Sequence, residues 1–253
     1  MSATARVCLF CGAGSVTREH VIPKAVSKRI QEVSPFTPEH GAPMPPSPTA
    51  VRFHTNRIID MVVNAACTDC NSVFFNALQS ACEPELSVAI GGDGVAMDTD
   101  KKRALCAWAY KTALLIPLSM AARSSWPAHV LAACSSFHRD RRPPIGAGVW
   151  TANYDVRDNF PDLVTRCDVS ELRFRRRGQD YEGTQVLFTL AYLVLIVVFW
   201  HGDAPDHFDL NSGPAPAESM ERLWPVRVGI FRWPPTKRLT YAELSSLGTW
   251  QSP

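Results

Sequence analysis

Two pairs of cysteines are the residues of this chain with the clearest capacity for chemistry. They are the C-x2-C pairs Cys8/Cys11 and Cys67/Cys70. A two-residue gap lets both thiolates of a pair reach one metal from a tight turn, and Gly12 suits such a turn. In a reducing compartment, two such pairs are typical of a structural zinc site with four thiolate ligands. Chance spacing and a redox pair are the alternatives.

A histidine beside a carboxylate lies between the two pairs. Glu19 and His20 open the segment EHVIP, and Asn71 directly follows the second pair. An imidazole exchanges protons near neutral pH, so His20 can take a proton from water. A lone histidine is more often a surface or packing residue. The position of His20 between metal ligands and next to an acid favours catalysis.

In this order, the segments CLFCG (8–12), EHVIP (19–23) and CTDCN (67–71) resemble an HNH endonuclease with a ββα-metal site. The layout is similar to phage Holliday-junction resolvases of the endonuclease VII type, and to bacterial HNH families with an EHVIP signature. The resemblance covers residues 8 to about 80. It implies that His20 is the general base.

The resemblance also implies the metals of the site. Glu19 and Asn71 would hold a catalytic Mg²⁺ or Mn²⁺, which prefers oxygen ligands and needs only a few from the protein. The four cysteines would hold a structural Zn²⁺ that clamps the strand carrying His20 to a helix beginning at Asn71. Adjacent residues of an ideal strand point to opposite faces, so Glu19 and His20 can share a site only on a distorted strand. Pro23 marks the end of that strand.

Basic side chains that could hold a nucleic-acid backbone lie in two places. Arg18 and Lys24 flank the catalytic segment. Arg173, Arg175 and Arg177 alternate along RFRRR and would share one face of a strand. Such a stripe suits phosphate contacts, and it equally suits an edge strand that is protected by charge.

The composition limits the classes of protein that remain. The chain has 253 residues, 46% hydrophobic and 20% charged, which excludes a disordered or coiled-coil protein. With 26 basic and 24 acidic side chains, any nucleic-acid site must come from local clusters and not from net charge. No N-terminal signal segment is recognised, so a cytoplasmic location is expected.

We expect an α+β fold that begins with the zinc-stabilised HNH module over residues 1–82. Six prolines predict an extended loop over 35–48, because proline cannot continue a helix or a central strand. After it, residues 51–63 have the character of a strand. A short helix then follows from Asn71, a residue type that often caps helices.

Residues 83–253 form an accessory α+β domain in this prediction. Its first part, 83–98, contains glycines and is expected to be irregular. A helix over about 100–116 follows, and Pro117 should end or kink it. The rest alternates strand-like runs with turns, which indicates a mainly antiparallel sheet.

The run from Val186 to Trp200 contains fifteen residues without a charge. A membrane-spanning helix needs about 20 apolar residues, and this run is short and rich in β-branched and aromatic side chains. One or two buried strands are therefore favoured over a membrane anchor, and no stable membrane association is expected. The four cysteines outside the pairs are expected to be buried apolar residues: Cys82, Cys106, Cys134 and Cys167.

The sequence thus predicts a metal-dependent HNH endonuclease that hydrolyses phosphodiester bonds, with DNA as the expected substrate. An RNase on the same site is one alternative, since only contacts to the 2′-hydroxyl distinguish RNA. A zinc-stabilised nucleic-acid-binding module without catalysis is another. One HNH site cuts one strand per event, so double-strand cleavage would imply either a homodimer or two binding events.

Overall fold

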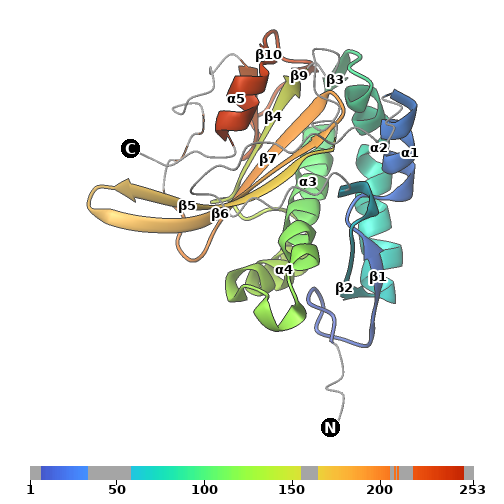
Figure 1. Ribbon diagram of the computed structural model, residues 1–253, viewed down its shortest axis with the longest axis vertical. Coiled ribbons are helices and arrows are strands. Elements are labelled where there is room, and N and C mark those ends of the chain that lie inside the picture. The colour runs from blue at the N-terminus through green and yellow to red at the C-terminus, as the bar shows by residue number, and fades with distance from the viewer. Residues whose placement is uncertain are drawn as a thin grey trace.

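The computed structural model of the chain describes residues 7–33, 58–154, 165–205, 208, 210 and 219–247. The expected proline-rich loop over 35–48 lies outside these residues, as does the first part of the expected strand over 51–63. The described part is a mixed α+β structure, as predicted (Figure 1).

A two-stranded antiparallel sheet begins the fold. It pairs β1 (Val16–His20) with β2 (Val62–Cys67). The expectation of one strand over 51–63 is wrong over residues 58–61, because the 3₁₀ helix η1 (Ile58–Asp60) precedes β2, and it is right for the last two residues. Inside β2, Val63 is buried and Asn64 is exposed, but Ala65, Ala66 and Cys67 are all buried, so the end of the strand is covered on both faces. Between the two strands in sequence lies α1 (Lys24–Val33), which buries one side of its surface.

The helix after β2 is longer than predicted. Helical turns begin at Thr68, form the π-helical stretch η2 (Cys70–Phe75) and continue as α2 (Asn76–Ile90). Asn71 therefore lies inside the helix and is not its N-cap, and the irregular segment expected from residue 83 begins only after Ile90. Cys67 ends β2 and Cys70 lies in the first helical turn, so the helix starts ahead of Asn71.

The helix α3 (Thr99–Met120) lies at the centre of the fold (Figure 1). The side chain of Asp98 caps it by accepting hydrogen bonds from the backbone N–H groups of Asp100 and Lys101. The helix continues past Pro117 to Met120, so of the two expected effects of Pro117, a helix end or a kink, the helix end does not occur. Most of the helix is buried, and packing on several sides offsets the hydrogen bond that the proline removes.

A six-stranded sheet packs against α3, in the order β10-β4-β7-β6-β5 with β8 also paired to β4. Every pair is antiparallel except β10 with β4, so the mainly antiparallel sheet is confirmed. Its strands are β4 (Gly148–Tyr154), β5 (Cys167–Arg176), β6 (Gln179–Leu190), β7 (Leu193–Trp200), β8 (Met220–Trp224) and β10 (Arg238–Leu239).

Shorter elements complete the described part. A second small sheet pairs β3 (Val95–Met97) with β9 (Phe231–Trp233), far apart in sequence. The helix α4 (Ala128–Asp140) follows the turn η3 (Arg123–Ser125) and packs on α3. The helix α5 (Tyr241–Leu247) lies on the opposite side of the sheet from α3 (Figure 1).

The uncharged run from Val186 to Trp200 forms the buried hairpin of β6 and β7, as predicted. One face of the hairpin, with Phe188, belongs to the core around α3; the other face, with Leu187, packs in a second core with Leu244 of α5. Burial on both faces explains why the run lacks alternation. Within the described part of the chain, no helix has both the length and the apolar character needed to cross a membrane.

The predicted boundary at residue 82 falls inside α2. A single buried cluster includes Phe75 and Leu86 from the two sides of that position, together with Trp108 of α3 and Phe188 of the sheet. The sheet of β1 and β2 and the six-stranded sheet therefore share α3 as a common core element (Figure 1).

Two histidines join α4 to the sheet. The rings of His129 and His201 stack with their centroids 3.5 Å apart. Their Nε2 atoms lie 3.1 and 2.9 Å from the Oγ1 atom of Thr184. Burial, followed by the neighbouring His201, lowers the pKa of His129 to about 4, and burial also lowers the pKa of His201.

Because of His129 and His201, we expect the protein to lose stability in mild acid. The pKa of His129 falls from an ordinary 6.5 to about 4 on folding, so the unfolded chain binds more protons between these values. The free energy of unfolding should therefore decrease as the pH falls from 6.5 towards 4, by on the order of 1 kcal/mol because solvent screens part of the effect. Urea unfolding at several pH values measures this slope. The variant His129→Gln should flatten it; an unchanged slope would contradict the assignment.

Candidate functional site

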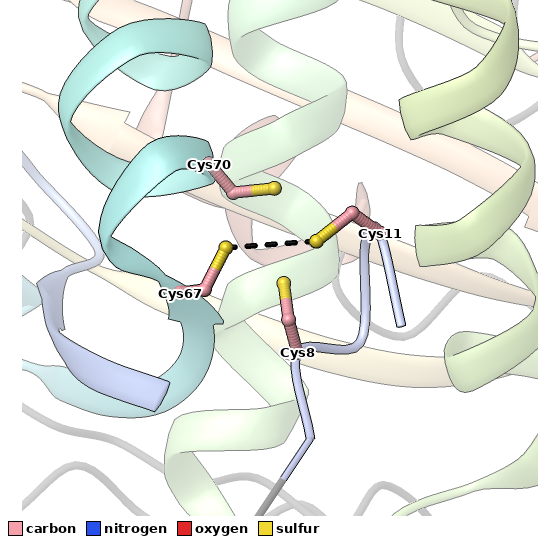
Figure 2. Close-up of side chains that lie close together, drawn as sticks. All are labelled: Cys8, Cys11, Cys67 and Cys70. Atoms are coloured by element: carbon pink, nitrogen blue, oxygen red, sulfur yellow. Dashed lines mark hydrogen bonds between the residues drawn. The ribbon is translucent and has the colours of Figure 1, made fainter. Parts of the chain in front are cut away.

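The sulfur atoms of Cys8, Cys11, Cys67 and Cys70 lie within 4.8 Å of one another. Figure 2 shows them pointing towards a common centre, with Sγ of Cys11 3.5 Å from Sγ of Cys67. Four thiolates at about 2.3 Å from one zinc ion stand roughly 3.8 Å apart. The cluster is compact enough for such a site, so the prediction that the two pairs come together as one group that could hold a metal ion is confirmed.

Local backbone structure positions the first pair. The N–H of Gly12 donates to the carbonyl of Cys8 over 3.0 Å, and Gly12 has a φ of 75°, which favours glycine. The N–H of Leu9 donates to the carbonyl of Ala65, which ties the turn to β2. Phe10 packs edge-on against Phe75, with ring centroids 4.9 Å apart. The turn is therefore attached to both β2 and the following helix.

The pKa values of Cys8 and Cys70 shift in opposite directions. Burial would raise the pKa of Cys8, but backbone N–H groups, that of Cys11 first, outweigh burial and lower it to about 7. Burial and the neighbouring thiols raise the pKa of Cys70. A divalent cation would offset the charge of several thiolates at once, and its binding would release their protons.

The remaining cysteines are buried, as predicted, and lie apart from this cluster. Burial raises the pKa of Cys82 to about 12, and it raises the pKa of the others as well. Thiols in this state are poor nucleophiles and poor metal ligands. The four buried cysteines outside the cluster are Cys82, Cys106, Cys134 and Cys167.

Glu19 points into the protein and pairs with Lys111 of α3. The Nζ atom of Lys111 lies 3.4 Å from Oε1 of Glu19, and the two side chains are 1% and 9% exposed. Burial raises the pKa of Glu19, and the charge of Lys111 opposes that rise. Burial lowers the pKa of Lys111, and the carboxylate opposes that change.

Sequence reasoning missed Lys111 as a residue of this site. The sequence does set Lys111 apart, since it is the single charged residue within the apolar segment ALCAWAYKTALLI (104–116). A charged side chain in the middle of a buried helix needs a partner. The partner lies 92 positions away in sequence, so only the fold identifies it as Glu19.

The strand that carries Glu19 and His20 is distorted where the site requires it. Thr17 pairs with Ala66 but Glu19 pairs with Val63, so two steps along β1 match three steps along β2. Such an irregularity changes the direction of nearby side chains. His20 is partly buried, and its Nδ1 atom is buried without a hydrogen-bond partner among the residues that the structure describes.

Asn71 lies directly against β1. Its Nδ2 atom donates to Oγ1 of Thr17 over 3.2 Å and to the carbonyl of Arg18 over 3.1 Å. Both bonds use the amide nitrogen, which leaves Oδ1 as the atom that could bind a metal. Asn71 is part of the π-helical stretch, and short π-helical turns are frequent at functional sites. The fold thus brings Asn71 to the strand of Glu19 and His20.

The predicted basic residues occupy two separate surfaces. Arg18 in β1 and Lys24 at the start of α1 are exposed next to the site. Arg173 and Arg175 are exposed on β5, which is an edge strand.

The arginines of β5 have carboxylate neighbours across the sheet. Nε of Arg173 lies 3.8 Å from Oε1 of Glu182, and Nη2 of Arg175 donates to Asp180 over 2.8 Å. Arg177 follows the strand in the hairpin turn, with a φ of 50°. These ion pairs favour a charge-protected edge strand over a phosphate-binding stripe.

Comparison of the chain with protein-family models, with curated proteins and with solved structures gave no match. Within the described part of the chain, the four-cysteine cluster is the one group of three or more cysteine, histidine or acidic side chains with the spacing of a metal site.

Proposed function

We propose that the chain is a metal-dependent HNH endonuclease that hydrolyses phosphodiester bonds of DNA. The observation that carries the proposal is the contact between Asn71 and β1. Its amide bonds to Thr17 and Arg18, directly beside Glu19 and His20, in a strand–strand–helix unit whose ends meet at four cysteines. These are the side-chain types that phosphodiester hydrolysis needs at one place.

In this proposal His20 acts as the general base. His20 is partly buried and lies next to Glu19 on β1, and a neutral imidazole there would accept a proton from the attacking water. Asn71, through Oδ1, and Glu19 would hold magnesium or manganese, and the donor set fits because both residues offer oxygen atoms. When bound, the metal would stabilise the charge on the phosphate and on the leaving oxygen.

The four cysteines would hold a structural zinc ion. Four protein thiolates fill a tetrahedral site and leave no position for water, so zinc takes no part in hydrolysis. Its role is to fix the end of β2 and the start of the helix, and with them Asn71, relative to β1. Arg18 and Lys24, exposed beside the site, would contact the DNA backbone. A double-strand cut would take either the second site of a homodimer or a second binding event.

One observation favours a second candidate, a zinc-stabilised nucleic-acid-binding module without catalysis. The carboxylate of Glu19 already has a positive partner in Lys111, so it does not require a metal for charge balance. Such a module would bind nucleic acid through Arg18, Lys24 and their neighbours alone.

Cleavage of labelled duplex DNA, single-stranded DNA and RNA of one sequence separates the candidates. We expect the zinc-loaded chain to cut duplex DNA with magnesium or manganese and to be inactive with EDTA. Binding that weakens as salt rises from about 50 to about 200 mM, without cleavage in either metal, would support the second candidate instead. Cutting of RNA alone would replace DNA as the substrate.

A further inference from the structure

We propose that Lys111 is a positioning residue of the catalytic metal site, acting through Glu19. The inference rests on the proposed function, because it gives Glu19 the role of metal ligand. Lys111 belongs to α3, outside the two strands and the helix that resemble an HNH module. The site would therefore be completed from the second part of the chain.

Among the residues that the structure describes, the ammonium group of Lys111 has one carboxylate partner, Glu19. Its Nζ atom donates to Oε1 of Glu19 and lies 5.0 Å from the centre of the Phe75 ring. The thiol of Cys82 is the other titratable group that interacts with it. The side chain is almost completely buried, so water cannot take the place of Glu19.

This arrangement fixes one oxygen of Glu19. The bond to Lys111 uses Oε1, which holds the carboxylate at a set rotation and leaves Oε2 for another ligand. A side chain that is hydrogen-bonded behind a metal ligand orients it, and removal of such a partner commonly weakens metal binding by about 10- to 100-fold. Phe75, in the π-helical stretch that also carries Asn71, packs against the same ammonium group.

Manganese binding to the zinc-loaded chain tests the inference without using nuclease activity. The electron paramagnetic resonance signal of free Mn²⁺ gives the dissociation constant. We expect Lys111→Met and Glu19→Gln each to weaken binding about 10-fold or more. In the Glu19→Gln background, Lys111→Met should cause no further loss, because Lys111 acts only through Glu19.

Lys102→Met is the matched control. Lys102 is a second buried lysine of α3, and its Nζ atom donates to the carbonyl of Arg227, away from Glu19. This variant loses a buried ammonium group from the same helix and should keep the manganese affinity of the wild type. Zinc content and circular dichroism identify variants that have not folded. If Lys111→Met fails this check, Lys111→Gln, which retains a hydrogen-bond donor, is compared in its place.

The outcomes separate the two proposals. Equal manganese affinity of wild type and a folded Lys111 variant would overturn the inference, as would an equal loss in the presence and absence of Glu19. A wild-type chain that binds no manganese would overturn it as well. Manganese binding that depends on Lys111, without cleavage of any nucleic acid, would support the inference and contradict the nuclease proposal.

Discussion

The variant Cys70→Ser is expected to lose its zinc and to destabilise the chain severely. Cys70 is buried, and its sulfur is one of four within 4.8 Å of one another. The zinc would connect segments that are far apart in sequence, since Cys11 and Cys67 are separated by 56 positions. Structural zinc binding is worth roughly 10–16 kcal/mol in small zinc domains, as much as the whole stability of a typical protein. Zinc analysis and thermal unfolding measure the loss.

Cys106→Ala provides the control for this prediction. Cys106 is fully buried but lies outside the metal cluster. Its replacement should keep about one zinc ion per chain and cost on the order of 1 kcal/mol of stability, as an ordinary core substitution does. Full zinc content in Cys70→Ser would contradict the assignment of the four ligands.

The features predicted from sequence are those that local spacing determines. The cysteine pairs each need only a two-residue gap, and their shared site follows from the chemistry of thiolates. The hairpin from Val186 to Trp200 follows from the absence of charge over a length too short for a membrane helix. In both cases the residues that form the sequence pattern are the same residues that form the predicted structure.

The features that sequence reasoning missed depend on distant contacts. The helix α2 includes Pro84 and continues to Ile90, where Leu86 and Ile90 pack in the buried cluster shared with α3. Asn71 was expected to cap that helix, but its amide bonds to β1 more than 50 positions earlier. Lys111 has its partner in Glu19, at a separation that no sequence period reveals.

The variant His20→Ala is expected to lose cleavage while it keeps the fold. No hydrogen bond holds Nδ1 of His20 within the described part of the chain, so its removal leaves no buried partner unpaired. A general base contributes about 10²- to 10⁴-fold to a rate, and the variant should lose a factor of this size. Its zinc content should match the wild type, because the cysteine cluster does not include His20.

Cleavage of supercoiled plasmid DNA by wild type and His20→Ala, in magnesium, manganese or EDTA, tests the central claim most directly. His129→Ala is the control and should cut like the wild type. His129 lies in α4 and contacts Thr184 of β6. The account predicts metal-dependent nicking by the wild type and the control, and none by zinc-replete His20→Ala. Equal nicking by wild type and His20→Ala would show that His20 is not the general base and that the proposed active site is wrong.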